Sequence, residues 1–502
     1  MSGLAENNNK DYGATSDEQE VCWNEEAGRA SLLNNSSNGS SSNRRNSVRE
    51  SILIMRQSIR ESTANLVRSS ITLSFGGRQC SVRSTGGTAT IATEFFNLVK
   101  NLVGAGMLAI PNGVAAFADA PSALLPGAFF TFLMGAIFGY YFTLIGRTCR
   151  LTHTATYREV WEQTMGDGQS LAIIVSLVNM TKPALGNLAY SMILADTFRS
   201  LFAAVQVEVS RTMSLLLITF LGLLPLCLLK NLSVLAPTSM LGVFGFAATT
   251  VVMGIRYFDG SYAEGGKFAT DMEEKYQPVF GNQGASAAWT NPKVLVLVCM
   301  LFEAFVAHYN APRFYTELKN NTVQRYALMT TYSFGASSLI YFLVMVFGFL
   351  TFGKACDGYI LNNYSNNDPM ATFCRLCVAM ALVCTYPIVF VGVRDAFLDL
   401  CKIPMEKHTS TNLNIVSVFL LTIITAIAAS ITDLGLVNAV GGGTLGTIVV
   451  FVFPAIMFRA AVEQQHPDDI DDGSLWEVNF AIALMWFGII LGIVGVYMAV
   501  TE

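Results

Sequence analysis

The chain has 502 residues, of which 52 % are hydrophobic and only 13 % are charged, and its formal net charge is −5. This charged fraction is roughly half that of an average soluble protein. Apolar runs of about twenty residues, each long enough to cross ~30 Å of hydrocarbon, recur from residue 91 to the C-terminus. The composition predicts an all-α polytopic membrane protein that is surrounded by the lipid bilayer, and it gives no support to nucleic-acid binding.

Residues 1–85 are rich in Ser, Asn and Gly, with an acidic first part and a basic second part. Such a composition buries no core, so we expect a disordered tail followed by a transmembrane domain over residues 86–502. The basic part places the tail in the cytosol. Residues 48–59 have a helical period, and two interpretations stay open, a basic helix on anionic lipid or chance periodicity. The sequence Arg44–Ser47 resembles a kinase site, which makes a kinase or another cytosolic regulator a candidate partner of the tail.

The apolar runs predict about eleven spans, and an odd number places the C-terminus in a lumen or outside the cell. The predicted outer loop before the eighth span holds a glycosylation sequon at Asn363. Cys356 and Cys374 flank this loop, and both a disulfide and two free thiols stay open. A vacuolar, lysosomal or plasma membrane is compatible with this topology. The spans cover residues 91–118, 122–147, 170–198, 213–229, 232–257, 293–311, 326–352, 370–394, 412–432, 435–459 and 478–500.

The first span carries a helix break. Gly104 and Gly106 interrupt the apolar run, Pro111 follows, and Lys100 lies one turn before the break. Inside a membrane, broken backbone is tolerated only where protein or a water-filled cavity surrounds it. Freed N–H groups at Gly104, Ala105 and Gly106 suit a carboxylate. The alternative is that these glycines only let helices pack closely, and Lys100 could reach the cytosolic interface instead of a site.

The sixth span carries Glu303 and His308 within one apolar run. Intramembrane acids and histidines commonly mark proton or substrate paths. For Glu303 the alternative is a structural ion pair with a buried basic group, and Lys182 in the third span is a candidate partner. Interrupted helices in corresponding positions of two five-helix halves predict an inverted-repeat transporter with a midplane site.

Three stretches resemble the amino acid/auxin permease family, which includes proton-coupled, vacuolar and sodium-coupled neutral amino acid transporters. They are the first-helix motif Gly104–Pro111, the sixth-helix segment Phe305–His308 with Tyr315–Lys319, and the eighth-helix residues Arg375, Thr385, Pro387 and Arg394. The resemblance spans about residues 91–500. It implies a fold like that of the bacterial leucine transporter, with helices 1 and 6 broken and one helix beyond the ten-helix core.

The resemblance also implies functional residues. The substrate would lie against Gly104, Ala105, Gly106, Phe302, Glu303 and Ala307. The ion-coupling residues would be Asn97, Lys100, Thr385 and His308. Sodium-coupled relatives place an asparagine ligand at the position of Lys100, whereas proton-coupled relatives tend to carry a lysine there. The lysine therefore favours protons.

We expect a secondary active transporter of small neutral amino acids that is coupled to protons. The alternatives are a sodium-coupled symporter and an amino-acid sensor that signals through its cytosolic tail. The sequence shows neither a catalytic constellation nor a phosphate-binding loop, so we expect no enzyme activity, no cofactor and no metal site.

Overall fold

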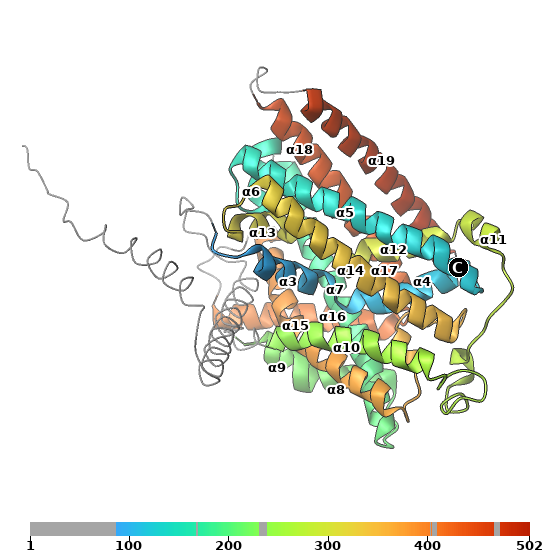
Figure 1. Ribbon diagram of the computed structural model, residues 1–502. Helices are drawn as coiled ribbons and strands as arrows, with labels where there is room; N and C mark the ends of the chain where they lie inside the picture. Colours follow the sequence, from blue (N-terminus) through green and yellow to red (C-terminus); the bar gives the residue numbers. More distant parts are fainter. Residues whose placement is uncertain are drawn as a thin grey trace, which may run out of the picture. The chain divides into compact units, whose positions relative to one another are not determined.

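The computed structural model describes residues 87–166, 169–229, 238–401, 403, 409–465 and 472–501. The kinase-like sequence and the periodic segment of the tail lie outside these residues. Within them the regular secondary structure is helical, and isolated β-bridges join Ala89 to Leu318 and Val279 to Gly353 (Figure 1). The α-helices are α3 (Ile91–Leu102), α4 (Ile110–Phe117), α5 (Leu124–Thr152), α6 (Tyr157–Met165), α7 (Gln169–Ala204), α8 (Arg211–Ile218), α9 (Leu224–Cys227), α10 (Thr238–Phe258), α11 (Ala285–Thr290), α12 (Val294–Ala304), α13 (Ala311–Glu317), α14 (Val323–Phe352), α15 (Pro369–Leu400), α16 (Ser410–Ser430), α17 (Leu434–Gly441), α18 (Phe453–Glu463) and α19 (Asp472–Val500).

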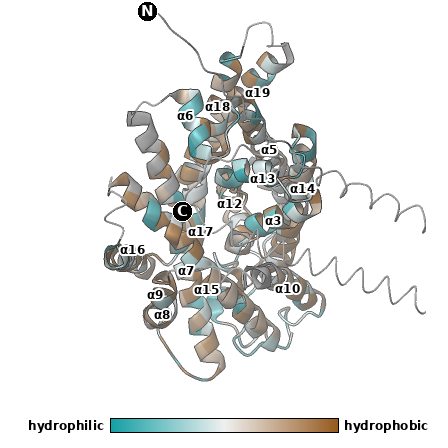
Figure 2. Cartoon of the chain, turned by 90° about the vertical axis from the view of Figure 1, so that its left-hand side faces the viewer, coloured by the Kyte–Doolittle hydropathy of each residue, from teal (hydrophilic) through white to brown (hydrophobic). Residues whose placement is uncertain are grey.

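The described part of every predicted span falls on a helix or on a series of short helices. Among the described residues, 7 helices are long and apolar enough to cross a membrane, or up to 8 if the bent first helix counts as one span. The number of about eleven stays a prediction. The helix α6, which lies between the second and third predicted spans, differs from the spanning helices. It is only 9 residues long and carries a hydrophilic stretch (Figure 2). It is too short and too polar to span hydrocarbon.

Burial separates central from peripheral helices. The most apolar window of Val294–Glu317 is 78 % buried, whereas the windows in Ser410–Ser430 and Ser474–Val500 are each 28 % buried. Their exposed apolar side chains suit contact with lipid. The unbroken helices α7 and α15 pack against each other, as do α5 and α14 (Figure 1). The broken sixth span therefore lies in the core of the helix assembly.

The first predicted break is confirmed. The helix α3 begins after the capping residue Thr90, whose hydroxyl accepts a hydrogen bond from the N–H of Thr93. It ends at Leu102, and Gly104 then adopts an extended conformation with φ −146° and ψ −161°. A 3₁₀ turn (η1, Ala105–Ala109) leads into α4, and the axes on either side of the break differ by 46°. A proline near the start of α4 is placed where its missing N–H costs nothing.

The second predicted break is also confirmed. The helix α12 ends at Ala304, and residues 305–307 are irregular. A 3₁₀ turn (η6, His308–Asn310) then leads into α13, which has Pro312 in its first turn. The tenth predicted span is irregular as well, since π-helical stretches η9 (Gly442–Gly446) and η10 (Ile448–Val452) separate α17 from α18.

Three side chains in and beside the predicted outer loop are buried. Asn363 is 1 % exposed, donates to the Ala355 carbonyl at 2.7 Å and accepts from the Asp357 N–H at 2.8 Å. Its amide is therefore not available to a glycan in the folded protein. Cys356 and Cys374 are buried and free, so the disulfide is not formed.

The close packing of η9 on α12 predicts the effect of a single methyl group. A Cβ at Gly442 would lie 2.0 Å from the Cys299 carbonyl oxygen and 2.6 Å from the Glu303 backbone nitrogen. The Gly442→Ala protein should lose about 1–3 kcal/mol of stability or fail to fold, because backbone cannot yield as a flexible side chain does. The measurement is the thermal unfolding temperature of the purified protein in detergent. Gly335→Ala is the control, because nothing lies within 4 Å of a Cβ there. Equal unfolding temperatures of both variants would contradict this packing.

Candidate functional site

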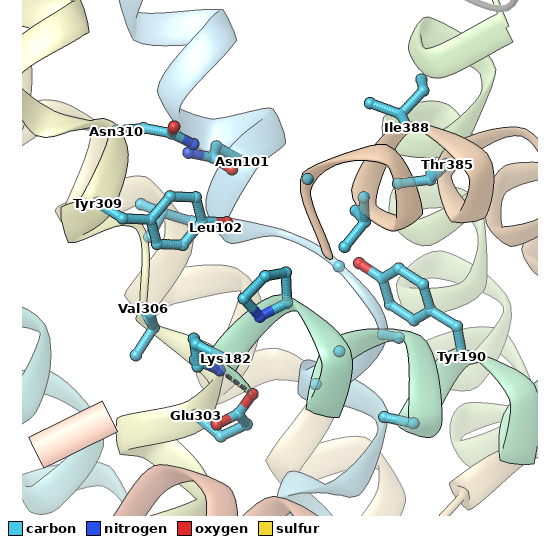
Figure 3. Close-up of a pocket in the computed structure, with 18 of the residues that line it drawn as sticks. Asn101, Leu102, Lys182, Tyr190, Glu303, Val306, Tyr309, Asn310, Thr385 and Ile388 are labelled. Atoms are coloured by element: carbon cyan, nitrogen blue, oxygen red, sulfur yellow. Dashed lines mark hydrogen bonds and ion pairs between the residues drawn. The ribbon is translucent and has the colours of Figure 1, made fainter. Parts of the chain in front are cut away.

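A cavity of about 710 Å³ lies where both helix breaks meet. One wall is formed by α3, η1, α12 and η6, and the opposite wall by α7 and α15 (Figure 3). Such a volume is within the usual range of small-molecule sites. The breaks thus line a cavity between helices instead of facing lipid, as broken backbone in a membrane requires.

The first break lines the cavity with backbone. Gly104, Ala105 and Gly106, for which the sequence predicts a binding role, all belong to the lining. The first N–H groups of a helix have no partner within that helix, and η1 starts at Ala105. Together with the positive end of the helix dipole, this edge of the cavity suits an anionic group.

The two breaks are joined by one hydroxyl group. Tyr341 on α14 is fully buried, and its hydroxyl oxygen lies 2.7 Å from the Leu102 carbonyl and 2.8 Å from the Ala304 carbonyl. These carbonyls end α3 and α12. One hydroxyl has one proton, so it donates to one carbonyl at a time. Tyr341 thereby offers a donor to the last carbonyl of either half-helix at the point where they converge, and each carbonyl keeps a second lone pair.

An ion pair crosses the cavity wall between α7 and α12. The Lys182 ammonium donates to a carboxylate oxygen of Glu303, and the side chains are only 9 % and 14 % exposed (Figure 3). This contact confirms Lys182 as the partner of Glu303. Both residues also line the cavity. Because their charges are opposite, the pair contributes no net charge to the site.

The residues predicted to couple an ion divide into two groups. Asn97, Lys100 and Thr385 line the cavity, with Asn97 1 % exposed and the Thr385 hydroxyl donating to the Ala381 carbonyl of its own helix at 2.8 Å. His308 does not line it. The His308 ring lies among Phe138, Phe142 and Phe334, with Nε2 3.0 Å from the Phe138 carbonyl oxygen.

Two predicted substrate residues also lie away from the cavity. Phe302 is fully buried and packs on Phe138 and Phe451. Ala307 is buried and is absent from the lining, to which Ala304 and Val306 contribute instead. For Phe302 the reason is helical geometry, since neighbouring residues of α12 point in directions about 100° apart, whereas Ala307 lies in the irregular segment after α12. Glu303 faces α7, and Phe302 faces α5.

Some lining residues were not predicted. Asn101 and Asn310 point toward each other across the two breaks, and Tyr190 and Tyr309 bring hydroxyl groups to the cavity (Figure 3). Gly186 on α7 leaves open space, because a Cβ at this position would have nothing within 4 Å. Asn101 and Asn310 are close in sequence to the two predicted helix breaks. Only the fold, which places the two breaks side by side, brings these residues together.

The cavity extends further toward one end of the helices than toward the other. It reaches Arg158 at the start of α6 and Asp395 near the end of α15. At the opposite end it stops at Ile193, one turn before contacts that close the structure. There Asp196 accepts from Arg211 at 2.7 Å, and the Thr197 and Tyr359 hydroxyls are 2.9 Å apart.

The loop behind this closed end is fixed by a buried arginine. Arg375 on α15 is 1 % exposed and donates to the carbonyls of Leu361, Tyr364 and Ser365 at 2.8, 2.5 and 3.2 Å. Five N–H donors in a rigid group suit this task. The conformation is therefore closed at the end that Arg375 supports.

Two broken helices that meet at a central cavity, walled by unbroken helices, are the arrangement of the leucine-transporter fold. The crystal structure of MhsT in complex with L-phenylalanine is similar in fold, with a TM-score of 0.50 at 12 % identity over 84 % of this chain and 100 % of that chain. A family profile described as transmembrane amino acid transporter protein matches residues 87–501. The chain belongs to this family, and it is a membrane transporter and not an enzyme.

Curated relatives are similar over most of their length. The provisionally named sodium-coupled neutral amino acid transporter 11 of Danio rerio is 25 % identical over 382 residues, which cover 74 % of this chain and 79 % of the relative. Solute carrier family 38 member 8 of Mus musculus is 24 % identical over 393 residues, which cover 74 % and 84 % respectively.

The bridging role of Tyr341 can be tested by removing its hydroxyl. Tyr341→Phe should lower stability by about 1–3 kcal/mol, because buried carbonyls lose their donor. It should also weaken substrate binding, since the half-helix ends are no longer held together. Both effects can be measured as unfolding temperatures with and without amino acid. Tyr332→Phe on the exposed face of α14 is the matched control. If the two variants behave alike, the hydroxyl does not position the breaks.

Proposed function

We propose that this protein carries small neutral amino acids across a membrane by secondary active transport. The observation that carries the proposal is the meeting of both helix breaks in one cavity, where backbone groups of opposite polarity face the same space. The N–H groups from Gly104 to Gly106 suit a carboxylate, and the last carbonyls of α12 around Ala304 suit an ammonium group. An amino acid presents both groups on one carbon atom. The name of the Danio rerio relative, a neutral amino acid transporter, agrees with this substrate class.

The orientation follows from the predicted topology, with the N-terminus in the cytosol. The cavity then extends toward the cytosol through Arg158 and Asp395 and is closed on the other side by the Asp196–Arg211 contact. The conformation would be one that exchanges substrate with the cytosol. A closed opposite end is what alternating access requires.

For the coupling ion we propose the proton. Lys100 lines the cavity at the position where the resemblance places a sodium ligand in sodium-coupled relatives. A lysine can release and rebind a proton, whereas a fixed ammonium group repels a metal cation. Sodium coupling is the second candidate. The name of the Danio rerio relative, which describes it as sodium-coupled, favours this alternative.

Uptake into proteoliposomes tests both parts of the proposal. Purified protein should accumulate labelled neutral amino acids when an inward proton gradient is imposed without sodium. Strict dependence on a sodium gradient at constant pH would refute proton coupling while leaving amino acid transport intact. Lack of uptake of any amino acid under both gradients would refute the transport proposal itself.

Lys100 variants locate the coupling step. Lys100→Arg keeps the positive charge but cannot release a proton near neutral pH. We expect it to lose accumulation driven by the proton gradient, by about tenfold or more, while exchange of preloaded amino acid continues. Lys319→Ala, which alters an exposed lysine outside the cavity, is the control and should transport normally. Full accumulation by Lys100→Arg would remove the lysine from proton coupling.

A further inference from the structure

The ion pair of Lys182 and Glu303 is placed where a substrate side chain would have to pass. Glu303 lies immediately before the last residue of α12, next to the break. Lys182 lies in the middle of α7, beside Pro183, on the opposite wall of the cavity (Figure 3). A substrate held by its main chain at the two breaks would share the cavity with this pair, because Lys182, Glu303, Val306 and Tyr309 all line it.

The carboxylate of Glu303 has little freedom to leave the pair. A Cβ at Gly441 would lie 3.1 Å from Glu303 Oε2, so the α17 backbone already borders this oxygen. Gly442 borders the Glu303 backbone in the same way. Within the described part of the chain, Oε2 has no hydrogen-bond partner. Lys182 is therefore the contact on which the charge of Glu303 depends.

We propose that the Lys182–Glu303 pair is the charge filter of the cavity and restricts the substrate to side chains without net charge. This inference rests on the proposed function. A cationic side chain would compete with Lys182 for Glu303, and an anionic one would compete with Glu303 for Lys182. Either competition leaves one charge of the pair buried without a partner, which is far more costly than keeping the pair. A neutral side chain leaves the pair intact, so the filter selects by rejection.

The filter predicts opposite changes of selectivity when either charge is removed. In Lys182→Met, Glu303 is unpaired, and the ratio of lysine uptake to leucine uptake should rise by about tenfold or more. In Glu303→Gln, Lys182 is unpaired, and the ratio of glutamate uptake to leucine uptake should rise to a similar extent. The double variant Lys182→Glu with Glu303→Lys restores a pair in reverse, so it should again prefer leucine. Uptake ratios are measured in proteoliposomes under the gradient that drives the unmodified protein.

A matched control comes from a second ion pair outside the cavity. Arg147 on α5 and Glu477 on α19 form a salt bridge with partly buried side chains, and neither residue lines the cavity. Arg147→Met and Glu477→Gln should leave both uptake ratios unchanged. If Lys182→Met does not fold, Lys182→Gln keeps a donor toward Glu303 while removing the charge, and the same ratios are measured. Cationic amino acids should then also raise its unfolding temperature more than leucine does.

The two levels of the proposal fail in different ways. If the unmodified protein transports leucine but folded Lys182 and Glu303 variants keep its uptake ratios, the charge filter is wrong and the transport proposal stands. If the unmodified protein already carries lysine or glutamate as well as leucine, the filter is again wrong. If the unmodified protein transports no amino acid, the proposed function itself fails.

Discussion

The hydroxyl group of Tyr341 lies between the last carbonyls of two half-helices that are about two hundred residues apart in sequence. A membrane interior offers no water to such carbonyls, and each one without a partner is costly. The two breaks can therefore persist only where other parts of the protein, or water in a cavity, supply donors. By ending α3 and α12 at the same hydroxyl, the chain places both breaks at one point. The cavity, its backbone donors and its polar side chains all follow from that convergence.

The charges of the cavity are arranged around this point. The Lys182–Glu303 pair connects a broken helix to an unbroken one and leaves no net charge. Lys100, on the broken first helix, lines the same cavity, and Arg158 and Asp395 line it further toward one end. The same pair joins α12 to α7, which belong to opposite walls, so any relative movement of these walls must act on it.

The sequence predicts the two helix breaks well because glycine and proline act locally. Gly104 and Pro111 disturb the helix wherever the rest of the chain lies. The partner of Glu303 could also be predicted, because an intramembrane acid needs a base and Lys182 is a buried base in another span. Residues at helix breaks were harder to assign. His308 and Phe302 share the sixth span with Glu303, but the rotation of α12 and the turn after Ala304 direct them into an aromatic cluster. The hydrogen-bonding roles of Tyr341 and Arg375 could not be predicted from the sequence. They depend on backbone carbonyls that only the folded chain brings together.

The most direct test of this account is an experimental structure of the protein with saturating L-leucine. The account predicts the leucine carboxylate within hydrogen-bond distance of the backbone N–H groups from Gly104 to Gly106. Its side chain should lie beside an intact Lys182–Glu303 pair, with Tyr341 still between Leu102 and Ala304. Leucine bound elsewhere in the protein, or bound in the cavity with its carboxylate on Lys182 and the pair broken, would contradict it.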